Sequence, residues 1–171
     1  YGQDDRSCAF TSVAAMLETE ISKRTSCCLC VDKEEIGSVG ATGMASFLFE
    51  NMVSELVAAT KEGYSELTVR RCLSNSNMLS SDVNAAFDPM NAGLFDKDNA
   101  CMDKAGVSYQ MAELGKVDQG GGGTIAYHAA KYGMNVLDAG VAVLSMHAPW
   151  EITSKEDICQ AYECYKAFLK I

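Results

Sequence analysis

Short apolar runs alternate with stretches of helical periodicity along the chain, and this alternation constrains the fold more than any other feature of the sequence. Apolar side chains recur at helical spacing in residues 6–20, 44–61, 124–132 and 154–169. Between these stretches lie shorter runs that predict strands, at residues 26–31, 77–83, 107–111 and 134–144, the last broken at Gly140. Strands that alternate with helices predict an α/β sandwich with a mostly parallel sheet.

Side chains that could bind a ligand or take part in catalysis lie near the ends of the predicted strands or shortly after them. In open α/β folds, ligands bind beyond the carboxyl ends of the strands. The side chains found there are Glu34, Glu35, Asp82 and His147. A further acidic pair, Asp4 and Asp5, precedes the first predicted helix. The sequence therefore places its candidate functional residues where this fold class places ligands.

Composition and charge exclude several classes of function. Hydrophobic residues make up 48% of the chain and charged residues 22%, as in an ordinary globular domain. The formal net charge of -9 argues against nucleic acid or an anionic membrane as the main partner. No apolar run approaches the roughly 20 residues of a transmembrane helix, and no secretory signal is visible. We therefore expect a cytoplasmic protein and, because the chain opens on Tyr1 without a Met, part of a longer one.

The eight cysteines predict reduced thiols rather than a disulfide framework or a zinc knuckle. Three of them, Cys27, Cys28 and Cys30, lie in the apolar run 26–31, and free cysteine behaves as a small buried hydrophobe. A zinc knuckle needs two Cys or His pairs at ligand spacing, and the chain offers no second pair. We therefore expect buried core thiols.

The candidate acids and the histidine fit a metal site, although each has a simpler explanation. Zinc binds carboxylate oxygen and imidazole nitrogen, and a carboxylate can bridge two ions. However, Asp4 also suits a helix N-cap, and Glu34 with Glu35 suits a solvated loop next to Lys33. Asp82 also suits a turn, and His147 a satisfied core histidine. The other histidine, His128, lies within a predicted helix and is expected to be structural or at the surface.

Five motifs occur in order along the chain and cover nearly all of it. They are GQDDR at 2–6, VDKEEIGS at 31–38, SSDVNAAFDP at 80–89, ELGKVDQGGGGT at 113–124 and LSMHAP at 144–149. This series resembles the bacterial branch of the aspartyl aminopeptidase (aminopeptidase I) family of zinc aminopeptidases. The resemblance implies a three-layer α/β/α zinc-peptidase sandwich with two co-catalytic Zn²⁺ ions. Mn²⁺ or Co²⁺ are alternatives, because oxygen-rich sites accept them.

The resemblance also implies a role for each motif residue. Asp4 resembles the bridging ligand and Glu34 the general base. Glu35 and His147 resemble the ligands of one zinc, and Asp82 resembles a ligand of the other. The resemblance further implies that Met146 lies near the bound substrate, and that the cleft is lined by Gly122, Gly123 and Thr124.

Departures from the family pattern limit what the resemblance implies. A further histidine ligand and a dimerisation domain lie upstream in the family. We therefore expect residues 1–171 to be the C-terminal part of a catalytic domain, and the protein to form a homo-oligomer through the missing domain. The family also has a longer segment where this chain has only residues 101–112, and we favour an unrecorded mobile loop over a true deletion.

The expected activity is removal of N-terminal residues from peptides that have a free N-terminus. Three alternatives stay open. One is a related dinuclear glutamyl or deblocking aminopeptidase. Another is a non-catalytic scaffold that keeps the fold for binding or assembly. The third is a plain structural α/β domain, which would bind no metal at all.

Overall fold

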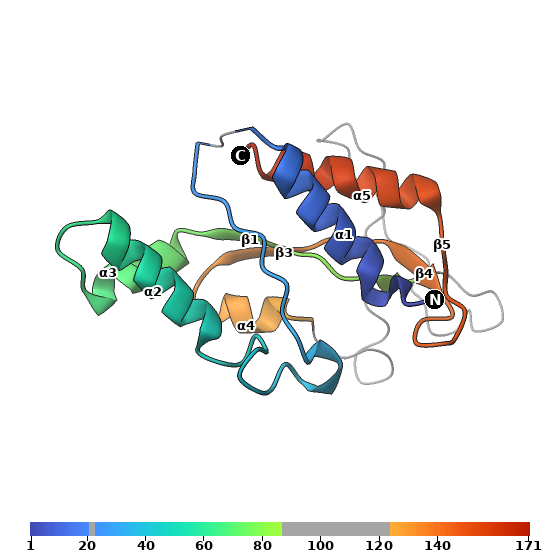
Figure 1. Cartoon of the computed structure of the whole chain (residues 1–171), viewed down its shortest axis with the longest axis horizontal. Helices are drawn as coiled ribbons and strands as arrows, with labels where there is room; N and C mark the ends of the chain where they lie inside the picture. Colours follow the sequence, from blue (N-terminus) through green and yellow to red (C-terminus); the bar gives the residue numbers. More distant parts are fainter. Residues whose placement is uncertain (21–22, 87–123) are drawn as a thin grey trace. The chain divides into compact units, whose positions relative to one another are not determined.

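The computed structural model describes residues 1–20, 23–86 and 124–171. These residues form two compact units, which are drawn together in Figure 1. Unit 1 contains the described residues of Tyr1–Cys28, Ser81–Gly122 and Ala139–Ile171. Unit 2 contains the described residues of Leu29–Ser80 and Gly123–Asp138. In the part of the chain that is described, no helix is long and apolar enough to cross a membrane.

Unit 1 is built on a three-stranded sheet of order β2-β4-β5. Strand β2 (Asn84–Ala85) pairs in parallel with β4 (Ala142–Leu144), and β4 pairs antiparallel with β5 (Ile152–Thr153). Val141 and Val143 are almost fully buried, so the apolar run before His147 forms the centre of this unit. The loop that carries His147 joins β4 to β5, which places it at the carboxyl end of the central strand.

Two helices of unit 1 pack against each other, α1 (Gln3–Glu18) and α5 (Lys155–Phe168) (Figure 1). Helix α5 begins where the sequence predicts, because the Ser154 side chain accepts a hydrogen bond from the Asp157 N–H at 3.3 Å. At the other end of the pair, Glu18 of α1 accepts a hydrogen bond from the Tyr162 hydroxyl. The two helices are therefore fixed by polar contacts as well as by packing.

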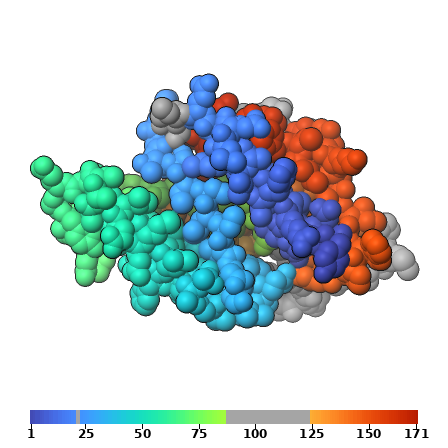
Figure 2. All heavy atoms as spheres, viewed as in Figure 1, coloured from blue at the N-terminus to red at the C-terminus, as the bar shows by residue number. Residues whose placement is uncertain are grey.

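The buried face of α1 differs from the face that the sequence favours. Small and polar side chains are buried, namely Ser7, Cys8, Thr11 and Ala15. Phe10 and Leu17, which share the predicted apolar stripe, are 71% and 80% exposed. The space-filling view shows α1 at the surface of the chain (Figure 2). Small residues allow α1 to approach its neighbours closely, and this close approach decides which face is buried.

A hydrogen-bonded cluster connects α1 and α5 with the segment before Asp82. The Ser12 hydroxyl of α1 donates to the Ser81 hydroxyl at 3.1 Å, Ser81 donates to the Tyr165 hydroxyl of α5 at 2.8 Å, and Tyr165 donates to the carbonyl of Ala139 at 3.0 Å. Burial, followed by the negative charge of Asp5, raises the pKa of the nearby Cys8 thiol to about 12. Burial also raises the pKa of Tyr165.

Unit 2 combines a two-stranded parallel sheet with three helices and one 3₁₀ turn. Strand β1 (Asn77–Ser80) pairs with β3 (Asn135–Asp138), with Asn77 opposite Asn135. The turn and helices are η1 (Glu34–Ile36), α2 (Leu48–Thr60), α3 (Glu66–Ser74) and α4 (Ala126–Ala130). Helix α4 packs on both strands, and α2 packs on α3.

The core of unit 2 lies between α2 and α3. Val57, Val69 and Leu73 are its buried members. Phe49 meets the ring of Tyr132 edge to face, with centroids 5.9 Å apart, and this geometry suits aromatic pairs. Helix α3 has its own N-cap, in which Ser65 accepts from the Thr68 N–H at 3.2 Å. Unit 2 therefore has its own hydrophobic core.

The α/β class predicted from the sequence is confirmed, but one predicted strand is wrong. The described residues of 23–33 contain no strand, so the predicted strand 26–31 is absent. Helix α3 and strands β2 and β5 were not predicted. The prediction of core thiols holds for Cys8 alone among the described cysteines, since Cys27, Cys30, Cys72 and Cys159 are exposed. The predicted strand 107–111 lies outside the described residues.

Candidate metal centre

Asp4 and His147 meet within unit 1. The Asp4 Oδ2 atom lies 3.2 Å from the His147 Nδ1 atom. The Asp4 side chain is 9% exposed and the His147 side chain 61% exposed. One residue belongs to the first turn of α1 and the other to the loop after β4, so the fold joins two distant motifs at one point. Because His147 faces solvent, the alternative of a core histidine is wrong.

The donor atoms of this pair fit zinc. Two ligands at bond lengths of about 2.0–2.1 Å around a tetrahedral ion lie about 3.3 Å apart. The observed distance of 3.2 Å matches this spacing. A carboxylate oxygen and an imidazole nitrogen are also the donor types that zinc takes. The pair can therefore serve as two ligands of one ion without rearrangement.

The backbone around Asp4 departs from helical geometry. Asp4 (φ -84°, ψ 108°) and Asp5 lie inside α1 with non-helical angles, and the peptide bond between them is cis. Gly2 occupies the N-cap position in the left-handed region, with no side-chain cap. The alternative that Asp4 is the N-cap is therefore wrong.

Strained backbone is concentrated at the candidate motifs. Among the described residues, four that are not glycine have positive φ: Lys33, Ser38, Ser145 and His147. Lys33 and Ser38 flank the turn that carries Glu34 and Glu35. His147 is the candidate ligand itself, and Ser145 lies two residues before it. Such conformations cost about 1–3 kcal/mol each and cluster at functional sites.

Glu34 and Glu35 lie on η1 in unit 2, and their surroundings are described within that unit. Glu34 is half-buried and Glu35 is exposed. The sequence makes Lys33 a neighbouring counter-charge for these acids, but its ammonium pairs with Asp32 at 3.1 Å. The turn thus presents two adjacent carboxylates on a tightly bent backbone.

Asp82 lies in unit 1, in the segment before β2. Its Oδ1 atom accepts a hydrogen bond from the Val83 N–H at 2.8 Å. Its backbone carbonyl lies against Gly140, where a Cβ atom would overlap it. This local bond agrees with the alternative that Asp82 is a turn residue.

The predicted substrate-lining residues are only partly described. Gly122 and Gly123 lie outside the described residues. Thr124 precedes α4 in unit 2, where its hydroxyl donates to Asp138 Oδ1 at 2.9 Å. Met146 is half-buried beside His147 in the β4–β5 loop.

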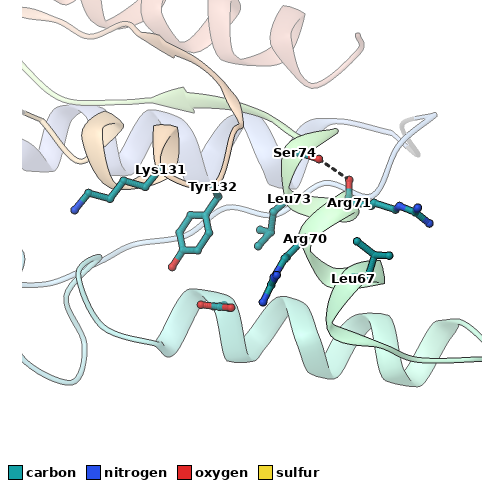
Figure 3. Close-up of a pocket in the computed structure, with 8 residues that line it drawn as sticks. Leu67, Arg70, Arg71, Leu73, Ser74, Lys131 and Tyr132 are labelled. Carbon is teal, nitrogen blue, oxygen red and sulfur yellow. Dashed lines mark hydrogen bonds between the residues drawn. The ribbon is translucent and has the colours of Figure 1, made fainter.

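Unit 2 also contains a pocket of about 450 Å³ that no predicted site residue lines. Arg70, Arg71 and Lys131 contribute positive charge to it, and Glu50 contributes negative charge (Figure 3). Tyr132 projects between helices α2 and α4, and its pKa is raised by burial and then by the charge of Glu50. The pocket is open and its charges lie largely at the surface, so it differs in character from the Asp4–His147 pair.

A sequence profile of the aminopeptidase I zinc metalloproteases (M18) matches residues 1–108 and 99–169. The chain belongs to the M18 family. A probable M18 family aminopeptidase 1 of Clostridium acetobutylicum is 49% identical over 203 residues, covering 99% of this chain and 43% of the relative. The matched region is longer than the 171 residues of the chain, so the relative carries additional residues within it.

Solved M18 structures share the fold. The crystal structure of aminopeptidase I from Clostridium acetobutylicum has a TM-score of 0.80 and 45% identity, covering all of this chain and 44% of that one. A Saccharomyces cerevisiae aminopeptidase solved as a dodecamer has a TM-score of 0.78 and 24% identity, covering 98% of this chain and 44% of that one. The chain thus spans less than half the length of these M18 proteins.

One polar residue beside the M18 motif pair was missed by the sequence reasoning. Glu151 is 8% exposed and accepts backbone hydrogen bonds from Asp4 and His147. The sequence offers one local indication of Glu151: it is an acid four residues after the candidate histidine, just before a short strand. Charged residues are rarely so buried without partners, but burial is not readable from this sequence pattern.

Proposed function

We propose that this chain supplies part of the catalytic domain of a metal-dependent aminopeptidase that removes N-terminal residues from peptides. One observation carries the proposal: the carboxylate of Asp4 and the imidazole of His147 lie 3.2 Å apart, at zinc-ligand spacing, on two segments that match the M18 profile. Residues 1–171 belong to that domain in this proposal.

The proposed ligand set extends beyond this pair. Asp4 would serve as the ligand shared by two zinc ions, His147 and Glu35 would be further ligands of one ion, and Asp82 would be a ligand of the other. Mn²⁺ or Co²⁺ would suit the same oxygen-rich donors. The support for Glu35 and Asp82 is their position in motifs that resemble the family, together with the strained turn at η1.

The proposed chemistry assigns proton transfer to Glu34. When bound, zinc would supply Lewis acidity that lowers the pKa of a water molecule towards about 7. Glu34 would act as the general base: it would take a proton from the water molecule that attacks the scissile carbonyl, and would deliver this proton to the leaving amine. Its neighbour Glu35 is committed to metal, so one turn divides two functions between adjacent carboxylates. Thr124, Gly122, Gly123 and Met146 line the substrate cleft in this proposal.

Partners and location complete the proposal. Substrates are peptides with a free N-terminus, and the net charge of -9 disfavours nucleic acid and anionic membranes. We propose a homo-oligomer, with support from the dodecameric structure of the yeast aminopeptidase of similar fold. We also propose a cytoplasmic location, with support from the described cysteines, which are free thiols.

The proposal is tested on the full-length protein by elemental analysis and by hydrolysis of aminoacyl chromogenic substrates before and after chelation. About two zinc-type ions per chain, with activity lost on chelation and restored by metal, are expected. Glu34→Gln should keep the metal and lower kcat by several orders of magnitude. His147→Ala should lower the zinc content, whereas His128→Ala, on α4, should not. A protein without metal and without hydrolysis would contradict the proposal and favour a non-catalytic scaffold.

A further inference from the structure

Glu151 joins the two candidate ligands through their backbones. Its Oε1 atom accepts a hydrogen bond from the His147 N–H at 2.9 Å, and its Oε2 atom accepts one from the Asp4 N–H at 3.2 Å. Each oxygen of the carboxylate therefore holds a different segment. The residue precedes β5 and is 8% exposed, and both hydrogen bonds are partly buried.

The carboxylate of Glu151 also meets the start of α1. The Asp4 N–H that donates to it belongs to the first turn of α1, where the unsatisfied amides and the helix dipole favour negative charge. Hydrogen bonds to a charged acceptor are about twice as strong as neutral ones.

The His147 amide belongs to backbone that needs support. His147 has a φ of 67°, a left-handed conformation that L residues with a side chain rarely adopt. Backbone of this kind persists only when the surrounding structure over-determines it. Asp4 is in an ordinary extended conformation, but it interrupts the helical angles at the start of α1. A single acceptor on both amides constrains the two segments together.

We propose that Glu151 is a positioning residue that sets the spacing of the Asp4 and His147 side chains without binding metal itself. Both carboxylate oxygens are engaged by backbone donors, which leaves Glu151 poorly placed to act as a ligand. This inference rests on the proposed function only where it concerns metal, because the backbone constraint exists with or without an ion.

The test compares Glu151→Gln with the matched control Glu156→Gln in the full-length protein. Gln has the shape of Glu, but its NH₂ group cannot accept a hydrogen bond, so one of the two bridges is lost. Glu156 is an exposed acid on α5 that contacts Gln160 and neither candidate ligand. The same chemical change is thus made inside and outside the bridge.

Two readouts separate positioning from general stability. Zinc affinity, measured by competition with a chelating dye, should fall about 10–100-fold in Glu151→Gln and stay unchanged in Glu156→Gln. At saturating zinc, kcat should recover and KM should match the wild type. Hydrogen exchange at the amides of Asp4 and His147, measured on the metal-free proteins, should be faster in Glu151→Gln alone. Equal zinc affinity and equal exchange in the two variants would overturn the proposal.

A second variant, Glu151→Asp, tests the same contact if Glu151→Gln does not fold. Glu151→Asp keeps the charge but is one methylene shorter, so it cannot span both amides. It should lose zinc affinity as Glu151→Gln does, and wild-type affinity in this variant would refute the bridge. If the wild-type protein binds no zinc, the proposed function fails, and amide exchange alone then decides whether Glu151 fixes the two segments.

Discussion

Gly140→Ala is the substitution whose effect the structure defines most sharply. Gly140 has no positive φ, so alanine is compatible with its backbone, and the obstacle is space alone. A Cβ atom there would overlap the backbone carbonyl of Asp82 and lie 3.3 Å from its N atom. Both neighbours are backbone atoms, which cannot rotate away as a side chain would. The segment before β2 must therefore move.

The cost follows from two opposing terms. Overpacking of this kind destabilises by about 1–3 kcal/mol, and rigid backbone places this case at about 3 kcal/mol. Replacing glycine stiffens the unfolded chain and returns about 0.4–1 kcal/mol. We therefore expect a net loss of about 2–3 kcal/mol in the free energy of unfolding, together with weaker zinc binding if Asp82 is a ligand.

Gly63→Ala is the matched control, because at Gly63 alanine would strain the backbone without overlapping any neighbouring atom. Gly63 has a φ of 76° and no atom within 4 Å of a Cβ, so its cost is backbone strain of about 1–2 kcal/mol without overlap. Guanidinium unfolding gives the free energies, and dye competition gives zinc affinity. A Gly140→Ala protein as stable as the wild type, with unchanged zinc affinity, would refute the steric argument.

The remaining predictions concern the buried cluster and the start of α5. Burial raises the pKa of Cys8 to about 12, so iodoacetamide at pH 8 should label it about a thousandfold more slowly in the folded protein than in the unfolded protein, as followed by mass spectrometry. The pKa of Cys8 in the folded state lies above its unfolded value near 9, so the neutral thiol stabilises the folded protein below pH 9, and this stabilisation is lost as the pH rises towards 12. Cys8→Ala should therefore weaken the alkaline pH dependence of the free energy of unfolding. Tyr165→Phe removes a hydroxyl that is hydrogen-bonded on both sides and should lower the free energy of unfolding by about 1–3 kcal/mol, and an unchanged midpoint would count against the cluster. Ser154→Ala removes the N-cap of α5 and should cost about 1 kcal/mol by the same measurement, with Ser154→Asp restoring the stability.

Elements with strong local signals were predictable from the sequence. The helix over 154–169 was expected from its apolar spacing and the Ser154 cap, and α5 spans Lys155–Phe168 with that cap formed. The break at Gly140 likewise separates β3 from β4. Capping and steric exclusion act within a few residues, so their signals survive in the sequence.

Features decided by tertiary contacts were not predictable. The apolar run 26–31 satisfies the pattern of a buried strand, but a strand needs a neighbour, which periodicity does not supply. On α1 the apolar stripe with Phe10 suggested the buried face, yet the small side chains around Cys8 are buried. The sequence could not reveal this because close helix packing selects small residues as readily as apolar ones.

The candidate site likewise contains residues that the sequence identified and one that it did not. Asp4 and His147 were selected by resemblance, and the structure brings them together. The roles of Glu34, Glu35 and Asp82 stay predictions. Glu151 acts on backbone amides, and amides are present at every position except proline, so no pattern of side chains identifies such a contact.

The contact between Glu151 and Asp4 also bears on the order in which the protein is made. The two residues are 147 positions apart along the chain, so Asp4 leaves the ribosome long before its partner exists. Closing so long a loop is among the slow steps of folding, because the entropy is lost before the contact forms. If Asp4 and His147 bind metal as proposed, they would do so only after Glu151 has been synthesised, and nascent chains stalled before Glu151 should be unable to retain zinc at this pair.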